Sequence, residues 1–144
     1  MADLIAAYVN TQQLDAIYQE FSDVNIDIDE YPMRGTIIVP KGDAARVRFS
    51  VYDEDGDAFD LSTAVDVEFA VSIDQSSPIF LSKKLSTGGI TVSGNTFTVT
   101  ITSANSKLPM HVRNYFEAAV QLTSTQRRTV AAGVYRAPDT ILGL

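Results

Sequence analysis

The stretch ARVRFSVYDEDGDAFDL, residues 45–61, decides the fold because its character changes halfway along. Its first half places Val47, Phe49 and Val51 at alternate positions, and this spacing predicts a half-buried β-strand. Asp55 and Gly56 follow, and glycine tolerates the positive φ that tight hairpin turns require. The stretch therefore predicts a strand that runs into an acidic hairpin turn.

The acids of this turn raise the question of a calcium loop. Asp53, Asp55 and Asp57 alternate as cation ligands do, but an EF-hand needs glycine at its sixth position and glutamate at its twelfth. Counted from Asp53, glycine stands fourth and Ala64 stands twelfth. The preceding residues also have strand spacing, where an EF-hand has a helix. We interpret the acids as a solvated turn and keep Asp53, Asp55 and Asp57 as the less favoured alternative, a cation site.

Alternating or β-rich runs recur along the body of the chain, separated by Gly, Pro, Asn and Asp. Short strands with such punctuation predict a mainly β fold, an immunoglobulin-like antiparallel β-sandwich. The Cys–Trp–Cys pattern of antibody domains is absent, since the chain has neither residue. The segment SANSKLP, residues 103–109, predicts a short helical turn. We expect strands at 35–39, 45–52, 65–73, 78–85, 89–92, 95–102, 114–123 and 128–136.

The first 34 residues have a different pattern. Leu14, Ile17, Tyr18 and Phe21 follow the spacing i, i+3, i+4, i+7, which predicts a short amphipathic helix over 12–21. An isolated helix of this length is marginal in water, so it needs a surface, either on its own sandwich or on a neighbouring subunit. The four apolar residues are therefore candidate partner-binding residues. We expect an acidic N-terminal arm, residues 1–34, and a sandwich domain, residues 35–144.

Charge is concentrated in this arm. The chain has 18 acids, of which seven lie in residues 1–30 together with no Lys or Arg, which leaves 11 acids against 11 bases in the rest. Nucleic acid is not an expected partner, because its binding depends on Lys and Arg that neutralise phosphates. A basic protein surface would suit the arm better.

Several other classes are also disfavoured. The chain has no cysteine for disulfides or thiolate metal sites, and no apolar run of the length that a membrane span needs. Its first residues lack the basic region of a secretory signal, so we expect synthesis in the cytoplasm. His111 is the only histidine, and no G-x-S-x-G motif accompanies it. The glycine-rich STGGITVSG lacks the lysine of a phosphate-binding loop. We predict no enzyme activity and no cofactor.

The order of motifs in residues 40–142 carries a resemblance. A Gly-Asp pair precedes the first long strand, GGITV leads into a strand rich in Thr and Val, a step SA…LP follows, and the aromatic strand NYFEAAV leads into the last hairpin. This order resembles small immunoglobulin-like virion proteins of tailed bacteriophages and is similar to the N-terminal domain of the phage baseplate upper protein family. Residues 1–34 and the stretch LPMHVRNYF depart from the family pattern.

The resemblance implies a non-enzymatic structural protein of a phage particle, in the tail, the baseplate or a fibre-connecting region. It implies other virion proteins and copies of the chain as partners, and location in the virion after assembly in the host cytoplasm. A capsid decoration protein is the alternative within this class. A carbohydrate-binding β-sandwich, with Tyr52, Tyr115 or Tyr135 stacked on sugar rings, is the alternative of another class, although the chain lacks tryptophan.

Overall fold

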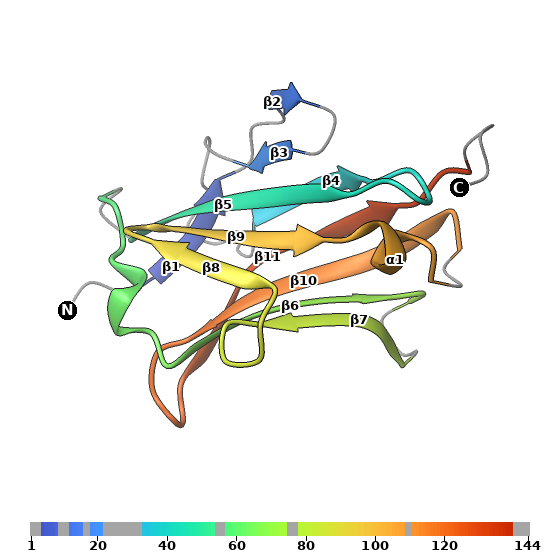
Figure 1. The fold of residues 1–144 in the computed structure, drawn as a ribbon. Coiled ribbons are helices and arrows are strands. Elements are labelled where there is room, and N and C mark those ends of the chain that lie inside the picture. Colours follow the sequence, from blue (N-terminus) through green and yellow to red (C-terminus); the bar gives the residue numbers. More distant parts are fainter. Residues whose placement is uncertain are drawn as a thin grey trace.

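The computed structural model describes residues 4–8, 12–15, 18–21, 33–53, 57–74, 78–108 and 111–139, with side chains from residue 35 onward apart from that of Asp53. These residues form two β-sheets packed against each other (Figure 1). The prediction of a mainly β protein is confirmed.

The strands of the first sheet are β1 (Leu4–Tyr8), β2 (Gln12–Asp15), β3 (Tyr18–Phe21), β5 (Ala45–Asp53), β8 (Ile90–Ser93) and β9 (Thr96–Ile101). Their order is β2-β3-β5-β9-β8, and β1 also pairs with β5.

The strands of the second sheet are β4 (Met33–Ile38), β6 (Asp66–Ser72), β7 (Ile79–Lys84), β10 (Arg113–Gln121) and β11 (Arg127–Arg136). Their order is β4-β11-β10-β6-β7, so β10 is the central strand. A 3₁₀-helix, η1 (Leu61–Thr63), and one turn of α-helix, α1 (Ser103–Ser106), lie between strands.

The eight strands predicted for residues 35–136 are all present, and each boundary differs by two residues or fewer from the prediction. The helical turn predicted at 103–109 is present as α1, which Thr102 and Asn105 cap reciprocally. Alternation predicts these strands correctly because Val47, Phe49 and Val51 are buried in the core, whereas the alternating Arg46 and Arg48 are more exposed.

Four phenylalanines form the centre of the core. Phe49 of β5 and Phe97 of β9 stack with ring centroids 4.8 Å apart within the first sheet. Phe69 of β6 and Phe116 of β10 stack at 5.8 Å within the second. Phe49 also lies 6.3 Å from Phe69 and 6.4 Å from Phe116, so its ring joins the two layers.

The prediction of an antiparallel sandwich needs correction, because two strand pairs among the described residues are parallel. β3 runs parallel to β5, and β4 runs parallel to β11. Neither pair is joined by a hairpin, which would impose the antiparallel direction. β4 instead leads through residues 39–44 into β5 of the opposite sheet.

The acidic turn also differs from an ordinary hairpin. The chain reverses as predicted, because Tyr52 forms an antiparallel bridge with Ala58 and the amide of Phe59 donates to the carbonyl of Val51 at 3.0 Å. The returning segment does not continue as a strand, however. It passes through η1 and enters β6 of the other sheet.

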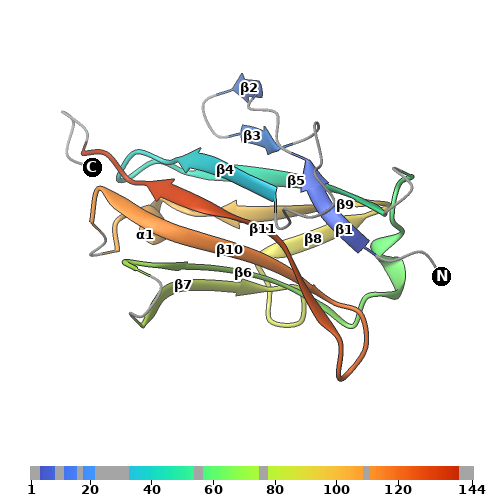
Figure 2. The same cartoon turned by 180° about the vertical axis from the view of Figure 1, so that it is seen from behind.

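The helix predicted over 12–21 is wrong for the residues that the structure describes. Gln12–Asp15 form β2 and Tyr18–Phe21 form β3, which lies along β5 (Figure 2). A short helix in isolation is marginal, whereas the free edge of β5 offers backbone donors and acceptors to an extended segment. Long-range pairing therefore overrides the local spacing.

Asp66, at the start of β6, ties the segment that follows β7 to β6. It is almost fully buried, and its carboxylate accepts hydrogen bonds from the amides of Val67 and Ser86 and from the Ser86 hydroxyl at 2.7 Å. Desolvation raises the pKa of this carboxyl, but the Ser86 and Val67 hydrogen bonds and the charge of Lys84 outweigh it, so the pKa of Asp66 is lowered.

We expect Asp66→Asn to lower the free energy of unfolding at pH 7 by about 1–2 kcal/mol, because an amide replaces one acceptor oxygen with a donor. A lowered folded-state pKa stabilises the protein above the unfolded-state pKa of about 4, and this contribution is lost as pH falls through the folded-state value. The difference between wild type and variant should therefore shrink below pH 4 in urea titrations. Asp139→Asn, at a side chain that is 78% exposed, is the control and should show little difference at any pH. A gap that widens in acid would contradict this account.

Candidate assembly surfaces

The outer edge of β5 is covered by two short strands from the N-terminal segment. β3 runs parallel to the first half of β5, from Tyr18 beside Arg46 to Phe21 beside Phe49. β1 runs antiparallel to the second half, from Leu4 beside Asp53 to Tyr8 beside Ser50. Together they pair with nearly the whole length of the strand.

Charge favours this placement of the acidic segment. Arg46 and Arg48 alternate with the buried Val47 and Phe49 and therefore lie on the outer face of β5. Glu20 is the register partner of Arg48 in the parallel ladder. Of the acids in the N-terminal segment, the described Glu20 thus lies along a strand that contains two arginines.

The four predicted partner-binding residues are separated by this arrangement. Tyr18 and Phe21 are the ends of β3, which pairs directly with β5, whereas Leu14 belongs to β2, one strand further out. Ile17 lies outside the described residues. Their role in binding a partner stays a prediction.

The proposed cation ligands fall largely outside the described side chains. Of Asp53, Asp55 and Asp57, the structure describes the side chain of Asp57, which is exposed. Nearby, Asp60 caps η1 by accepting from the amide of Ser62 at 2.9 Å, and this bond lowers the pKa of Asp60. Within the ranges that the structure describes, no three His, Cys, Asp or Glu residues gather as a possible metal site.

The outer face of the second sheet forms an open groove of about 1060 Å³. Tyr115 of the central strand lies in it, flanked on the same strand by Arg113 and Glu117. The Arg113 guanidinium carbon lies 5.8 Å from the centre of the Tyr115 ring. The neighbouring strands contribute small or apolar residues and three hydroxyl residues to the rest of the lining: Gly35, Ala70, Ile79, Ala132, Gly133 and Val134, with Thr36, Ser72 and Thr129.

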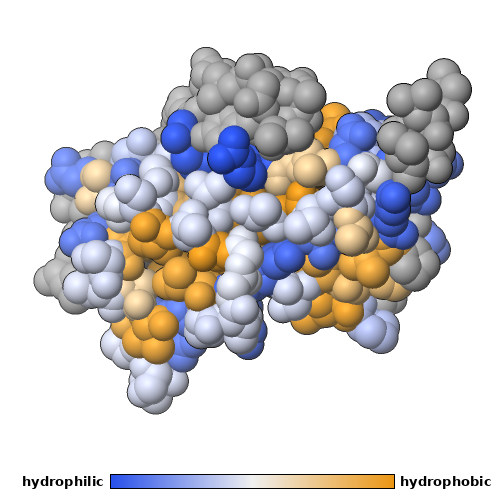
Figure 3. All heavy atoms as spheres, in the orientation of Figure 1, coloured by the Kyte–Doolittle hydropathy of each residue, from blue (hydrophilic) through white to orange (hydrophobic). Residues whose placement is uncertain are grey.

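The apolar surface on the side shown in Figure 1 is divided. Figure 3 shows hydrophobic residues in two areas of that face, one towards the end with η1 and one towards the end with α1, with hydrophilic residues between them. The groove, by contrast, brings apolar and charged side chains of five strands to one face of the second sheet.

One carbohydrate-stacking candidate is corrected by the structure. Tyr135 is fully buried, and burial raises the pKa of its hydroxyl. β11 contains an extra residue, Val130, where Ala118 pairs with Ala131 but Ala119 pairs with Thr129. This bulge reverses the inward–outward alternation, so Tyr135 faces the core and Val134 faces outward. Tyr52 and Tyr115 are half-buried.

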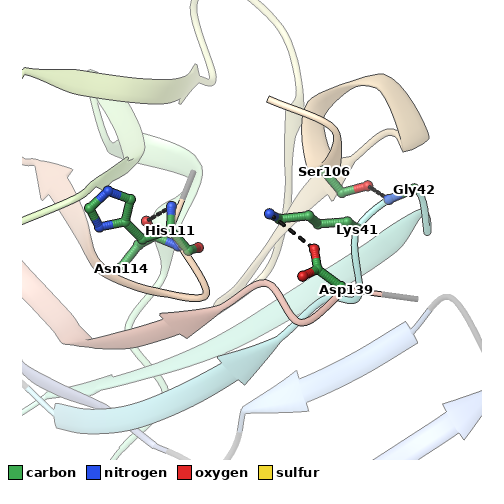
Figure 4. A network of polar contacts seen from close by, with 6 residues as sticks. All are labelled: Lys41, Gly42, Ser106, His111, Asn114 and Asp139. Carbon is green, nitrogen blue, oxygen red and sulfur yellow. Dashed lines mark hydrogen bonds and ion pairs between the residues drawn. The ribbon is translucent and has the colours of Figure 1, made fainter. Parts of the chain in front are cut away.

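Polar residues around α1 and the turn between β4 and β5 have structural roles (Figure 4). The Ser106 hydroxyl is fully buried, accepts from the amide of Gly42 at 2.9 Å and lies 2.7 Å from the carbonyl of Asp43, to which it donates. It therefore fastens α1 to the turn between β4 and β5. Lys41 in the same turn forms an ion pair with Asp139 at 3.2 Å.

His111 is exposed and takes part through its backbone. The buried Asn114 side chain accepts from the His111 amide at 3.1 Å and donates to the carbonyls of His111 at 2.7 Å and Tyr135 at 3.3 Å. Asn114 thus fixes the backbone at the start of β10. The alternation of apolar residues in the sequence did not predict this structural role.

We expect Asn114→Ala to lower the free energy of unfolding by about 2 kcal/mol, because it leaves buried backbone groups without their partner. His111→Ala is the matched control and should change stability by less than about 0.5 kcal/mol, since its imidazole is exposed. Urea unfolding followed by circular dichroism measures both. Equal losses for the two variants would refute the assigned role of Asn114.

Comparison with protein-family models and with curated proteins gives no match. In the part of the chain that the structure describes, no helix has the length and apolar character that a membrane span would require.

Proposed function

We propose that the chain is a non-enzymatic structural subunit of a tailed-bacteriophage particle, located in the tail, the baseplate or a fibre-connecting region, and that its sandwich is immunoglobulin-like. Its partners are other virion proteins and copies of itself. The order of motifs over residues 40–142 supports the phage assignment, through its resemblance to small virion proteins.

The strand order supports an immunoglobulin-like fold. In that fold, strands B, E and D share one sheet, and strands C, F and G share the other. Here β5, β9 and β8 are neighbours in the first sheet, and β6, β10 and β11 are neighbours in the second, with β7 as an additional edge strand. The connections follow the same sequence order.

The assembly role depends on one observation, the addition of N-terminal strands to the edge of β5. Strand addition derives its affinity from main-chain hydrogen bonds, so the same ladder can form on the β5 edge of an adjacent subunit. Glu20, the register partner of Arg48, would favour this pairing over other edges.

Deletion of residues 1–30 tests the proposal. We expect the truncated chain to keep a folded sandwich and to be lost from purified particles, as measured by mass spectrometry of those particles. A peptide of residues 1–21, added in trans, should bind the truncated protein. A full-length variant with Asp15→Asn and Glu20→Gln tests the contribution of charge. It should be incorporated less efficiently than wild type.

Normal incorporation of the truncated chain would refute the docking role of the arm. Cryo-microscopy of the particles separates the two locations within this class, because density on the outer shell would favour the capsid decoration alternative. Absence of the wild-type chain from every purified particle would refute the virion assignment itself.

A further inference from the structure

The groove on the second sheet carries opposite charges on either side of Tyr115, and this pattern is complementary to itself when a second copy is related by a two-fold axis. Arg113, Tyr115 and Glu117 alternate along β10, so all three project from the outer face. Arg113 and Glu117 are exposed. Four residues along a strand span about 13 Å, and the Arg113 guanidinium lies over the Tyr115 ring between the two charged positions.

We propose that this face binds a second copy of the chain, through a two-fold axis that passes near Tyr115 and runs perpendicular to β10 in the plane of the interface. Such an axis makes the two β10 strands antiparallel, so Arg113 of each copy lies against Glu117 of the other. The inference rests on the proposed function, because it assigns one of the self-contacts that a subunit present in many copies needs.

The shape of the groove fits this arrangement. Gly35, Ala70, Ala132 and Gly133 carry small side chains or none, and they leave room around Tyr115 for a ring from the second copy. Ile79 on β7 is 61% exposed and adds an apolar margin. Thr36, Ser72 and Thr129 add hydroxyl groups to the same surface. A central aromatic residue with mixed small, apolar and polar surroundings and charges near it is compatible with the anatomy of a protein interface.

The charges allow a decisive swap experiment with the purified full-length protein. Arg113→Glu places two acids together at both symmetric contacts, and Glu117→Arg places two bases together. Each variant should weaken dimerisation by about tenfold or more in analytical ultracentrifugation, because like charges are brought together. The double variant R113E/E117R should dimerise within about threefold of wild type, since both contacts are restored with the signs exchanged.

Mixing the two single variants gives a further test. A heterodimer of Arg113→Glu with Glu117→Arg has opposite charges at both contacts, so the mixture should dimerise more strongly than either variant alone. Lys107→Glu, an exposed change with the same effect on net charge as Arg113→Glu, is the control and should leave dimerisation unchanged.

A wild-type protein that is monomeric at every concentration tested would overturn the proposal. So would single variants that dimerise normally, or a double variant and a mixture that show no recovery. Binding of the monomer to a glycan array, lost in Tyr115→Ala, would assign the groove to carbohydrate instead. These outcomes are independent of particle incorporation, which the arm deletion measures, so each proposal can fail without the other.

Discussion

Phe49→Ala should lower the free energy of unfolding by about 4 kcal/mol, the largest loss that we expect from a single truncation in the core. The Phe49 ring is fully buried and contacts rings of both sheets, at centroid distances between 4.8 and 6.4 Å. Its removal leaves a cavity between the layers, and the neighbouring rings belong to different sheets and cannot fill it together. Urea unfolding at constant pH measures the loss.

Two further variants make this result interpretable. Phe49→Leu should lose about 1–1.5 kcal/mol, because it keeps most of the apolar volume. Ile79→Ala, at a side chain that is 61% exposed, should change stability by less than about 0.5 kcal/mol. A loss for Phe49→Ala that is no greater than the loss for Ile79→Ala would show that the four rings do not hold the layers together.

Gly133→Ala should lower the free energy of unfolding by about 3 kcal/mol, because a methyl group there has no room. A Cβ atom on Gly133 would overlap the carbonyl oxygen of Gly35, its register partner on β4. A backbone atom cannot rotate away as a side chain can, so β4 must move off β11. In the described part of the chain, β11 is the strand that holds β4 in the sheet.

Gly94→Ala separates this overlap from ordinary backbone strain. Gly94 has a φ of +60° in the turn between β8 and β9, and no atom lies within 4 Å of the position that a methyl group would take there. The substitution should therefore cost about 1 kcal/mol, the cost of a left-handed conformation alone. Equal losses at Gly94 and Gly133 in urea unfolding would mean that β4 accommodates the methyl group.

Local sequence patterns were sufficient for the strands of the body. Val47 and Phe49 alternate with Arg46 and Arg48 because one face of this strand is buried. Such a pattern can be recognised from a single strand without knowledge of its neighbours. The inserted Val130 limits the same reasoning, because one extra residue reverses the faces from that point on. Tyr135 was consequently expected at the surface and lies in the core.

Prediction from local sequence patterns failed more completely in the N-terminal segment. The spacing of Leu14, Tyr18 and Phe21 satisfies a helix, yet β2 and β3 form because β5 has an edge to which an extended chain can bind. The groove was missed for a related reason. Its residues come from five strands, and the spacing of apolar residues within one strand does not predict which strands are neighbours in the sheet.

The two short strands on β5 also divide that edge into separate zones. β3 covers Arg46–Phe49 and β1 covers Ser50–Asp53, each with its own ladder. We expect the two ladders to open separately, so the β5 amides that face β3 and those that face β1 should take up deuterium at two distinct rates. A single strand thereby reports the attachment of each N-terminal segment independently.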